Sequence, residues 1–265
     1  MAAWEFFLTE YTKRSLTMVK DRLPALSAIA RLISTSIDSE YFAGLWSNSL
    51  VKGMCWTMRQ PFTGKPHRDT YFPRTYIAPS FSWVSVVGPV RYKTSSLGPK
   101  PRWLALPVSQ YIVHRTDDTF GRVSEAYVDL KAVLLPARLS SVRGGQGFEL
   151  HIDCIPNVRN TRVEVDGPIK RIAQKYGLSS TLRRFPTPPG GYQPGEEAFI
   201  DTPIHLMPLF AEGVALNHTV TWCLLLGSVS DNVGYERLGN ATVDVKTAIS
   251  DFGILDKEKQ IIRIF

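Results

Sequence analysis

The sequence predicts an α+β protein in which an N-terminal helical unit packs on an antiparallel β domain of the sandwich or barrel-like kind. Through the first ~55 residues, apolar positions recur every three or four residues, which is the period of a helix. After residue 80, short segments alternate apolar and polar positions and are separated by turn residues, which is typical of antiparallel strands. We therefore divide the 265 residues into a helical unit, 1–58, and a β domain, 59–265.

Three helices are expected in the N-terminal unit. The first covers residues 4–16, whose large apolar side chains share one face. The second begins at Asp21, a residue type that caps helices well, and carries Pro24 in its first turn. The third begins at Tyr41 and ends near Gly53, because glycine is favoured just after the last helical turn.

Strands are expected wherever apolar and polar residues alternate. The segment from Phe81 to Val86 has this period, and the segment from Arg122 to Pro136 keeps it over the longest distance, with one phase slip. The other expected strands are residues 108–115, 148–155, 161–165, 205–210, 220–227, 235–245 and 261–265. Many short strands with turns between them predict an antiparallel sheet.

Residues 140–199 are rich in proline and glycine, and we expect them to form a long exposed insertion that is partly disordered. Seven basic residues and only two acidic ones lie between Arg159 and Arg184, which accounts for most of the net charge of +7. A solvated charged loop is the favoured interpretation. Nucleic-acid binding is a less favoured alternative, because few aromatic residues interleave with these charges. The candidate contacts for a partner or an anion are Arg171, Lys175, Arg183 and Arg184.

No catalytic, metal or cofactor motif is found, so we expect a protein that is not an enzyme and holds no cofactor. The five histidines and three cysteines have no paired-ligand spacing. The nearest approach is the run from His151 to Cys154, which reads better as a strand with a buried thiol. The glycine-rich run from Gly144 to Gly147 precedes a strand and therefore predicts a hairpin turn, not a dinucleotide site.

The sequence also predicts a cytoplasmic protein that does not insert into membranes. Its apolar runs are much shorter than the ~20 residues of a spanning helix, and its first residues do not resemble a secretory signal. Three scattered cysteines suit a reducing compartment and do not form a disulfide framework. Cys55, Cys154 and Cys223 are each expected to behave as small hydrophobic residues.

Several segments together resemble a known family. They are EYTKRSLTMVKDRLPALSAIA within residues 4–30, YFAGLWSNSLVKGMCW at 41–56, YIAPSFSWVSVVGPVRY at 76–92, FGRVSEAYVDLKAVLL at 120–135 and CLLLGSVSDNVGYERLGNATV at 223–243. In order and spacing they resemble the region downstream of the HET domain in fungal heterokaryon-incompatibility proteins. Phe81 stands where that family usually has Trp, and Ala28 where it has Gly.

The resemblance implies a non-catalytic regulatory or protein-interaction region in fungal self/non-self recognition. Strings resembling the HET-domain motifs L-S-Y-C-W-G and D-x-x-C-I-N-Q do not occur in these 265 residues, so a truncated or stand-alone family member is expected. The family's death-signalling residues therefore have no counterpart here. Two alternatives stay open: an enzyme or accessory protein of fungal secondary metabolism with a pocket in the β domain, and a nucleic-acid binder. The aromatic residues of the motifs are expected to belong to the core.

Overall fold

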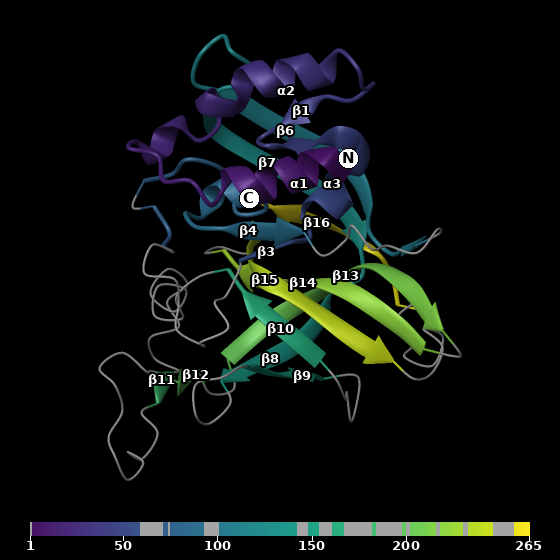
Figure 1. Cartoon of the computed structure of the whole chain (residues 1–265). Coiled ribbons are helices and arrows are strands. Elements are labelled where there is room, and N and C mark those ends of the chain that lie inside the picture. Colours follow the sequence, from purple (N-terminus) through teal and green to yellow (C-terminus); the bar gives the residue numbers. More distant parts are fainter. Residues whose placement is uncertain are drawn as a thin grey trace.

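The chain has the α+β fold that the sequence predicts. The computed structural model describes residues 2–58, 71–73, 75–92, 101–141, 148–153, 161–166, 182–183, 198–199, 202–215, 218–229, 233–245 and 257–265. The helices lie on one side of a large sheet. Strands β8 (Leu135–Ser141), β9 (Phe148–Ile152) and β10 (Thr161–Val165) of the same sheet lie on the side away from the helices (Figure 1). In these ranges, no helix has both the length and the apolar character needed to cross a membrane.

The first helix, α1 (Ala2–Tyr11), is shorter than predicted because Thr12 turns the chain. The Thr12 hydroxyl donates to the Leu8 carbonyl at 2.8 Å and accepts the Val90 amide at 3.0 Å. These bonds satisfy backbone groups at the end of α1 and attach it to strand β4 (Val90–Tyr92).

The second helix also differs from its prediction. Two 3-10 turns, η1 (Val19–Asp21) and η2 (Pro24–Leu26), precede α2 (Ser27–Ser34). Asp21 does not cap a helix. Its carboxylate instead accepts a bond from Arg122 at 2.6 Å, so that a tertiary ion pair replaces the expected local contact.

The predicted third helix is wrong over its first half. Residues 41–46 form a hairpin of β1 (Tyr41–Phe42) and β2 (Leu45–Trp46). Ala43 and Gly44 between them have φ of 49° and 92°, the left-handed backbone that a two-residue hairpin turn requires and a helix forbids. The chain becomes helical only afterwards, in η3 (Ser47–Ser49) and α3 (Leu50–Gly53).

The strand predicted from Phe81 to Val86 is wrong as well, because the chain there forms a 3-10 turn, η4 (Trp83–Ser85). The Ser82 hydroxyl accepts the Val84 amide at 3.1 Å and donates to the Ala43 carbonyl at 2.6 Å. The alternation of serine with large apolar residues therefore reflects a capped turn whose serines bond to backbone. Beside it, β3 (Trp56–Met58) pairs with β4.

The large sheet confirms most of the predicted strands. Its order is β6-β7-β16-β15-β14-β13-β8-β9, with β10 also pairing with β15 and β5 with β13; only the β15–β16 pair is parallel among the described strands. The strands are β5 (Arg102–Trp103), β6 (Leu106–His114), β7 (Val123–Ala132), β8 (Leu135–Ser141), β9 (Phe148–Ile152), β10 (Thr161–Val165), β13 (Thr202–Ala215), β14 (His218–Ser228), β15 (Tyr235–Val245) and β16 (Gln260–Ile264). The segment predicted as one strand from Arg122 to Pro136 is two, β7 and β8, and these pair with different neighbours.

The predicted insertion, residues 140–199, contains two strands of this sheet, β9 and β10. A separate pair joins β11 (Leu182–Arg183) to β12 (Ala198–Phe199). Most of the remaining insertion lies outside the described residues.

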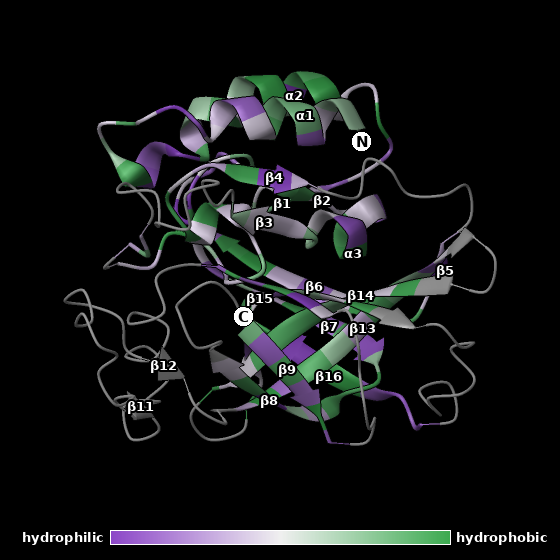
Figure 2. Ribbon diagram, turned by 60° about the horizontal axis from the view of Figure 1, so that its bottom comes forward, coloured by the Kyte–Doolittle hydropathy of each residue, from purple (hydrophilic) through white to green (hydrophobic). Residues whose placement is uncertain are grey.

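Strand β14 is buried on both faces, which explains its apolar run. Leu224 and Leu226 pack in the hydrophobic cluster under the helices, whereas Cys223 and Leu225 pack in a second cluster on the opposite side. Strands β8 and β9 (Figure 2) supply much of that second cluster, and Val165 of β10 joins it. The sheet therefore has a helix-side core and a second core between its own strands.

We predict that Gly239→Ala in β15 lowers the free energy of unfolding by about 2–3 kcal/mol, because an added Cβ cannot be accommodated. That Cβ would meet the Glu164 carbonyl oxygen at 2.3 Å and Val165 Cα at 2.8 Å, both backbone atoms of β10. Urea denaturation followed by circular dichroism measures the loss.

Gly213→Ala in β13 is the matched control, because a Cβ at Gly213 meets nothing within 4 Å. Both substitutions reduce the conformational entropy of the unfolded chain to the same extent. Because Gly213→Ala adds no clash, its free energy of unfolding should change by less than about 1 kcal/mol. Equal losses in the two variants would contradict the close approach of β10 to β15.

Candidate functional site

The four basic residues predicted to contact a partner are not brought together by any described contact. Arg171, Lys175 and Arg184 lie outside the described residues. Arg183 lies on β11, where the structure describes the backbone alone. The binding role assigned to these four positions stays a prediction.

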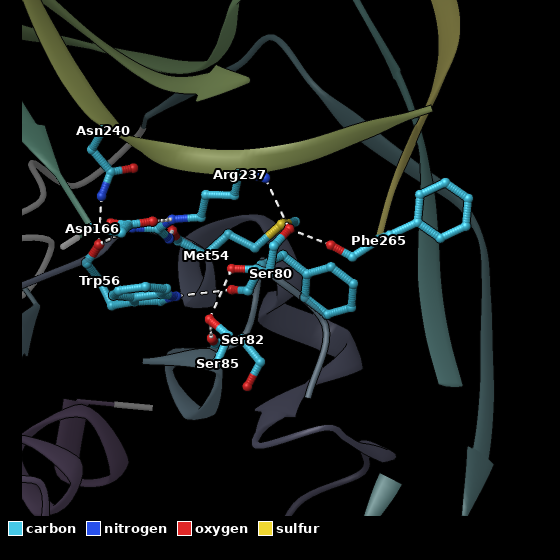
Figure 3. Close-up of polar contacts among 10 residues, drawn as sticks. Met54, Trp56, Ser80, Ser82, Ser85, Asp166, Arg237, Asn240 and Phe265 are labelled. Carbon is cyan, nitrogen blue, oxygen red and sulfur yellow. Dashed lines mark hydrogen bonds and ion pairs between the residues drawn. The ribbon is translucent and has the colours of Figure 1, made fainter. Parts of the chain in front are cut away.

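The most extensive polar cluster that the structure describes surrounds Arg237 of β15 (Figure 3). The Arg237 guanidinium donates from Nε to Asp166 Oδ2 at 2.6 Å and from Nη2 to Asp166 Oδ1 at 2.9 Å. The two side chains are 0% and 3% exposed, so the ion pair is almost entirely removed from water. An ion pair this deep requires every donor to be satisfied.

The remaining donors of Arg237 reach the helix side of the sheet. Nη1 donates to the Met54 carbonyl and Nη2 to the Trp56 carbonyl, which also accepts Asn240 Nδ2. The guanidinium lies 3.5 Å from the centroid of the Trp56 ring. Each nitrogen of the guanidinium therefore has an acceptor, and the cluster fastens β3 and β10 to β15.

Ser80 extends the same cluster to β16. Its amide donates to the Phe265 carbonyl at 2.8 Å, and its hydroxyl donates to that carbonyl and accepts the Arg237 amide. Ser80 therefore ties the segment before η4 to two strands of the sheet (Figure 3).

The described thiols and imidazoles do not form a reactive group. Burial raises the pKa of Cys55 to about 12 and also raises that of Cys223, so both thiols stay protonated near neutral pH. His151 Nε2 lies 3.9 Å from Asp153 Oδ1 on an exposed surface, and Cys154 lies outside the described residues. In the part of the chain that the structure describes, no three His, Cys, Asp or Glu residues are placed to hold a metal ion.

A different kind of site lies on the face of β6, β7 and β16 that points away from the helices; we call it the outer face. Register places Leu106, Lys131 and Ile261 in one row across the three strands. Leu106 and Ile261 are exposed apolar side chains. The outer face is therefore an exposed part of a sheet whose other face is core.

In the next rows of the outer face, an ion pair and stacked aromatic rings hold the side chains in place. Asp129 accepts two bonds from Arg263, at 2.8 and 2.9 Å, and one from Ser109 at 2.7 Å. Arg263 lies 3.9 Å from the centroid of the Tyr127 ring, and Tyr127 stacks on Tyr111 at 5.0 Å. These contacts fix side chains on a surface that solvent reaches.

Strand β6 forms the edge of this face. None of its nine residues is Asp, Glu, Lys or Arg, and burial lowers the pKa of its single histidine, His114. The exposed apolar and aromatic side chains of the strand are Leu106, Val108, Tyr111 and Val113. One edge of β6 pairs with β7, and no described strand pairs with the other. An exposed, uncharged strand edge is suited to pairing with another chain.

An open depression of about 610 Å3 lies beside β6 on the helix side. Gln110 of β6 reaches it, donating from Nε2 to Glu40 Oε2 at 2.8 Å and to Ser47 Oγ at 3.2 Å. Its lining is mostly polar: Ser34, Ile37, Asp38, Ser39, Glu40, Ser47 and Asn48. The depression adds hydrogen-bonding groups next to the strand edge.

Sequence patterns located β6 but not its position at an edge of the sheet. The strand was predicted at residues 108–115, and its lack of charged residues was the one available signal that it lies at an open edge. Comparison of the chain with protein-family models, with curated proteins and with solved structures finds no match in any of the three. The resemblance to heterokaryon-incompatibility proteins therefore stays a prediction from the motifs.

We predict that Arg237→Met lowers the free energy of unfolding by about 3–5 kcal/mol, because it leaves Asp166 buried without its partner. Arg138→Met is the control: it removes an arginine–carboxylate pair with Asp153 in which both side chains are more than 40% exposed, so its loss should stay below about 1 kcal/mol. Urea denaturation measures both, and Asp166→Asn gives a milder test if Arg237→Met does not fold. Similar losses at the two arginines would contradict the fastening role.

Asp129 generates a pH-dependent prediction. Hydrogen bonds from Arg263, then Ser109, hold the pKa of the Asp129 carboxyl below its ordinary value of 3.8. Because the pKa of Asp129 is lower in the folded chain than in the unfolded chain, the ionised carboxylate stabilises the fold at pH values above the unfolded-state pKa of about 4. This contribution is lost as the pH falls through the lower, folded-state pKa. Wild type should therefore exceed Asp129→Asn in unfolding free energy at pH 6, and the difference should shrink towards pH 2.5. A difference that does not change with pH would contradict this account.

Proposed function

We propose that this chain is a non-catalytic protein-interaction region that binds an extended segment of a partner protein along the open edge of β6. The observation that carries the proposal is the uncharged stretch Ser109–Val113 of the edge strand, which lies between Pro107 and the second register shift and has exposed Tyr111 and Val113 side chains. Edge strands of stable proteins usually carry charges that prevent such pairing. Backbone hydrogen bonds from β6 would supply affinity, and the outer face would supply specificity.

The outer face defines the chemistry of the segment that would fit. An added strand continues the rows of the sheet, so its alternate side chains lie beside Ser109, Tyr111 and Val113, which follow the register shift in β6. The position beside Ser109 meets the Asp129–Arg263 ion pair and suits a hydrogen-bonding side chain. The next positions meet Tyr111 and Val113 and suit apolar or aromatic side chains.

We also propose that the chain acts, in the cytoplasm, as a regulatory region related to fungal heterokaryon-incompatibility proteins. The motif residues that carry this resemblance bond to one another in the core. Trp56 Nε1 donates to the Phe81 carbonyl at 2.8 Å, and Trp83 Nε1 donates to the Gly44 carbonyl at 2.9 Å. This supports a role for the motifs in folding, with recognition left to the surface of the β domain.

Peptide selection tests the β6 proposal directly. A phage-displayed library of random 12-residue peptides is selected on the whole chain. We expect enriched peptides with apolar residues at alternate positions and without proline, because a strand presents alternate side chains to each face. On binding, hydrogen exchange of β6 amides should slow.

The double variant Val108→Lys, Val113→Lys should lose at least about tenfold in affinity for these peptides, since charges on an edge strand oppose pairing. Phe6→Lys on α1 is the control, because it also charges an exposed apolar side chain, and α1 packs against β4. Peptides that bind equally well to both variants would refute the proposal.

The two alternatives predict other results. A nucleic-acid binder using Arg171, Lys175, Arg183 and Arg184 would bind RNA or DNA with an affinity that falls steeply as salt rises. That binding would not respond to the β6 substitutions. An enzyme of secondary metabolism would show turnover of a small molecule that the β6 substitutions leave unchanged.

A further inference from the structure

The open edge of β6 contains a regular stretch that is symmetric about Tyr111. Register shifts interrupt the pairing of β6 with β7 between Pro107 and Ser109 and again between Val113 and His114. The five residues between the two shifts pair with β7 without interruption. When two identical antiparallel strands overlap completely, the central residue of one lies opposite the central residue of the other. A second copy of β6 that pairs over the whole stretch therefore places Tyr111 opposite Tyr111 and Ser109 opposite Val113.

This register joins two rows of aromatic rings into one. Tyr111 stacks on Tyr127 of β7 at 5.0 Å, and Tyr127 meets the Phe265 ring at 6.0 Å. The row ends at Tyr111, whose side chain is 42% exposed. Residues directly opposite in antiparallel strands have their Cβ atoms about 5 Å apart, so the second Tyr111 would continue the row. Aromatic pairs across strands stabilise a sheet.

Like charges do not oppose this pairing, although the chain carries a net charge of +7. None of the residues from Ser109 to Val113 is Asp, Glu, Lys or Arg. On the outer face, the charged side chains of these rows begin one strand back, with Asp129 and Glu125 of β7. In this register, Asp129 of one copy and Glu125 of the other share a row and lie three strand spacings apart, about 14 Å. That separation exceeds the Debye length of about 8 Å at physiological salt, so the repulsion is largely screened.

The helix-side residues of the stretch are already ordered within one copy. Gln110, which would lie opposite Ile112, donates from Nε2 to Glu40 and to Ser47. Ile112 packs against the helix-side core. Pairing therefore does not need to immobilise these side chains, which keeps the entropic cost of association low.

We propose that β6 pairs with β6 of a second copy of this chain, antiparallel and centred on Tyr111, to form a symmetric dimer. This inference rests on the proposed function, because it names the partner of the same strand edge. The twofold axis passes between the two Tyr111 side chains, and the two sheets become one. A five-residue contact is small against the ~1,200 Å² of a standard interface, so the dimer is weak and reversible.

Sedimentation equilibrium of the whole chain, from about 5 µM to about 1 mM, tests the dimer. We expect reversible dimerisation with a Kd of tens to hundreds of micromolar. Val113→Lys should raise this Kd at least about tenfold, because it places a charge on the edge where the second copy pairs. Phe6→Lys on α1 is the matched control, since it adds the same charge at an exposed apolar side chain outside β6, and its Kd should equal that of wild type.

Disulfide cross-linking tests the register. Ser109→Cys and Val113→Cys chains are mixed and oxidised, and they should form a linked dimer because the two positions lie opposite one another, with Cα atoms about 5 Å apart. Either variant alone places its two new thiols about 13 Å apart along the strands and should cross-link no more than wild type. Wild type sets the background because it contains Cys55, Cys154 and Cys223.

The results separate this inference from the proposed function. A chain that stays monomeric over the whole concentration range, or a dimer that Val113→Lys leaves unchanged, would overturn the inference. If such a chain still binds selected peptides and they slow hydrogen exchange in β6, the proposed function stands and the partner is a different protein. If no peptide protects β6 either, both fail. Linkage of either cysteine variant alone that is as efficient as linkage of the mixture would contradict the register centred on Tyr111.

Discussion

The attachment of the helix side to the sheet depends on the buried ion pair of Arg237 and Asp166. This ion pair links strands β10 and β15, and through two carbonyl acceptors it reaches Met54 and Trp56 on the helix side. Because an unpaired charge at this depth is strongly disfavoured, the cluster is stable only when all three segments are in place. The ion pair therefore couples the folding of residues more than a hundred positions apart in the chain.

Two parts of the sheet differ in how their faces are covered. Strands β13 and β14 are covered on both faces, and their side chains are committed to two hydrophobic clusters. Strands β6, β7 and β16 are covered by helix-side residues on one face only. On the other face, the hydrogen bonds that Ser109 and Arg263 donate to Asp129 hold the side chains in place. A surface that is rigid and exposed can be complementary to a partner without a large ordering cost, which is why the proposed function is placed there.

Sequence patterns predicted the elements that local periodicity controls. The strands from 161 to 165 and from 235 to 245 have the bounds expected for them, because their alternation matches one strand each. The helix expected from Tyr41 failed because left-handed backbone at Ala43 and Gly44 is invisible to a hydrophobic period. The strand expected at Phe81 failed because Ser82 bonds to Ala43, a partner 39 positions away in the chain.

The sequence by itself determined the α+β class, most of the strands and the apolar character of the motif residues. These follow from side-chain period and from burial, which are local or compositional properties. Only the tertiary structure decided that β6 lies at an edge of the sheet, and that each guanidinium nitrogen of Arg237 has an acceptor. Edge position and hydrogen-bond satisfaction depend on neighbours that are distant in the chain, and a linear pattern does not contain them.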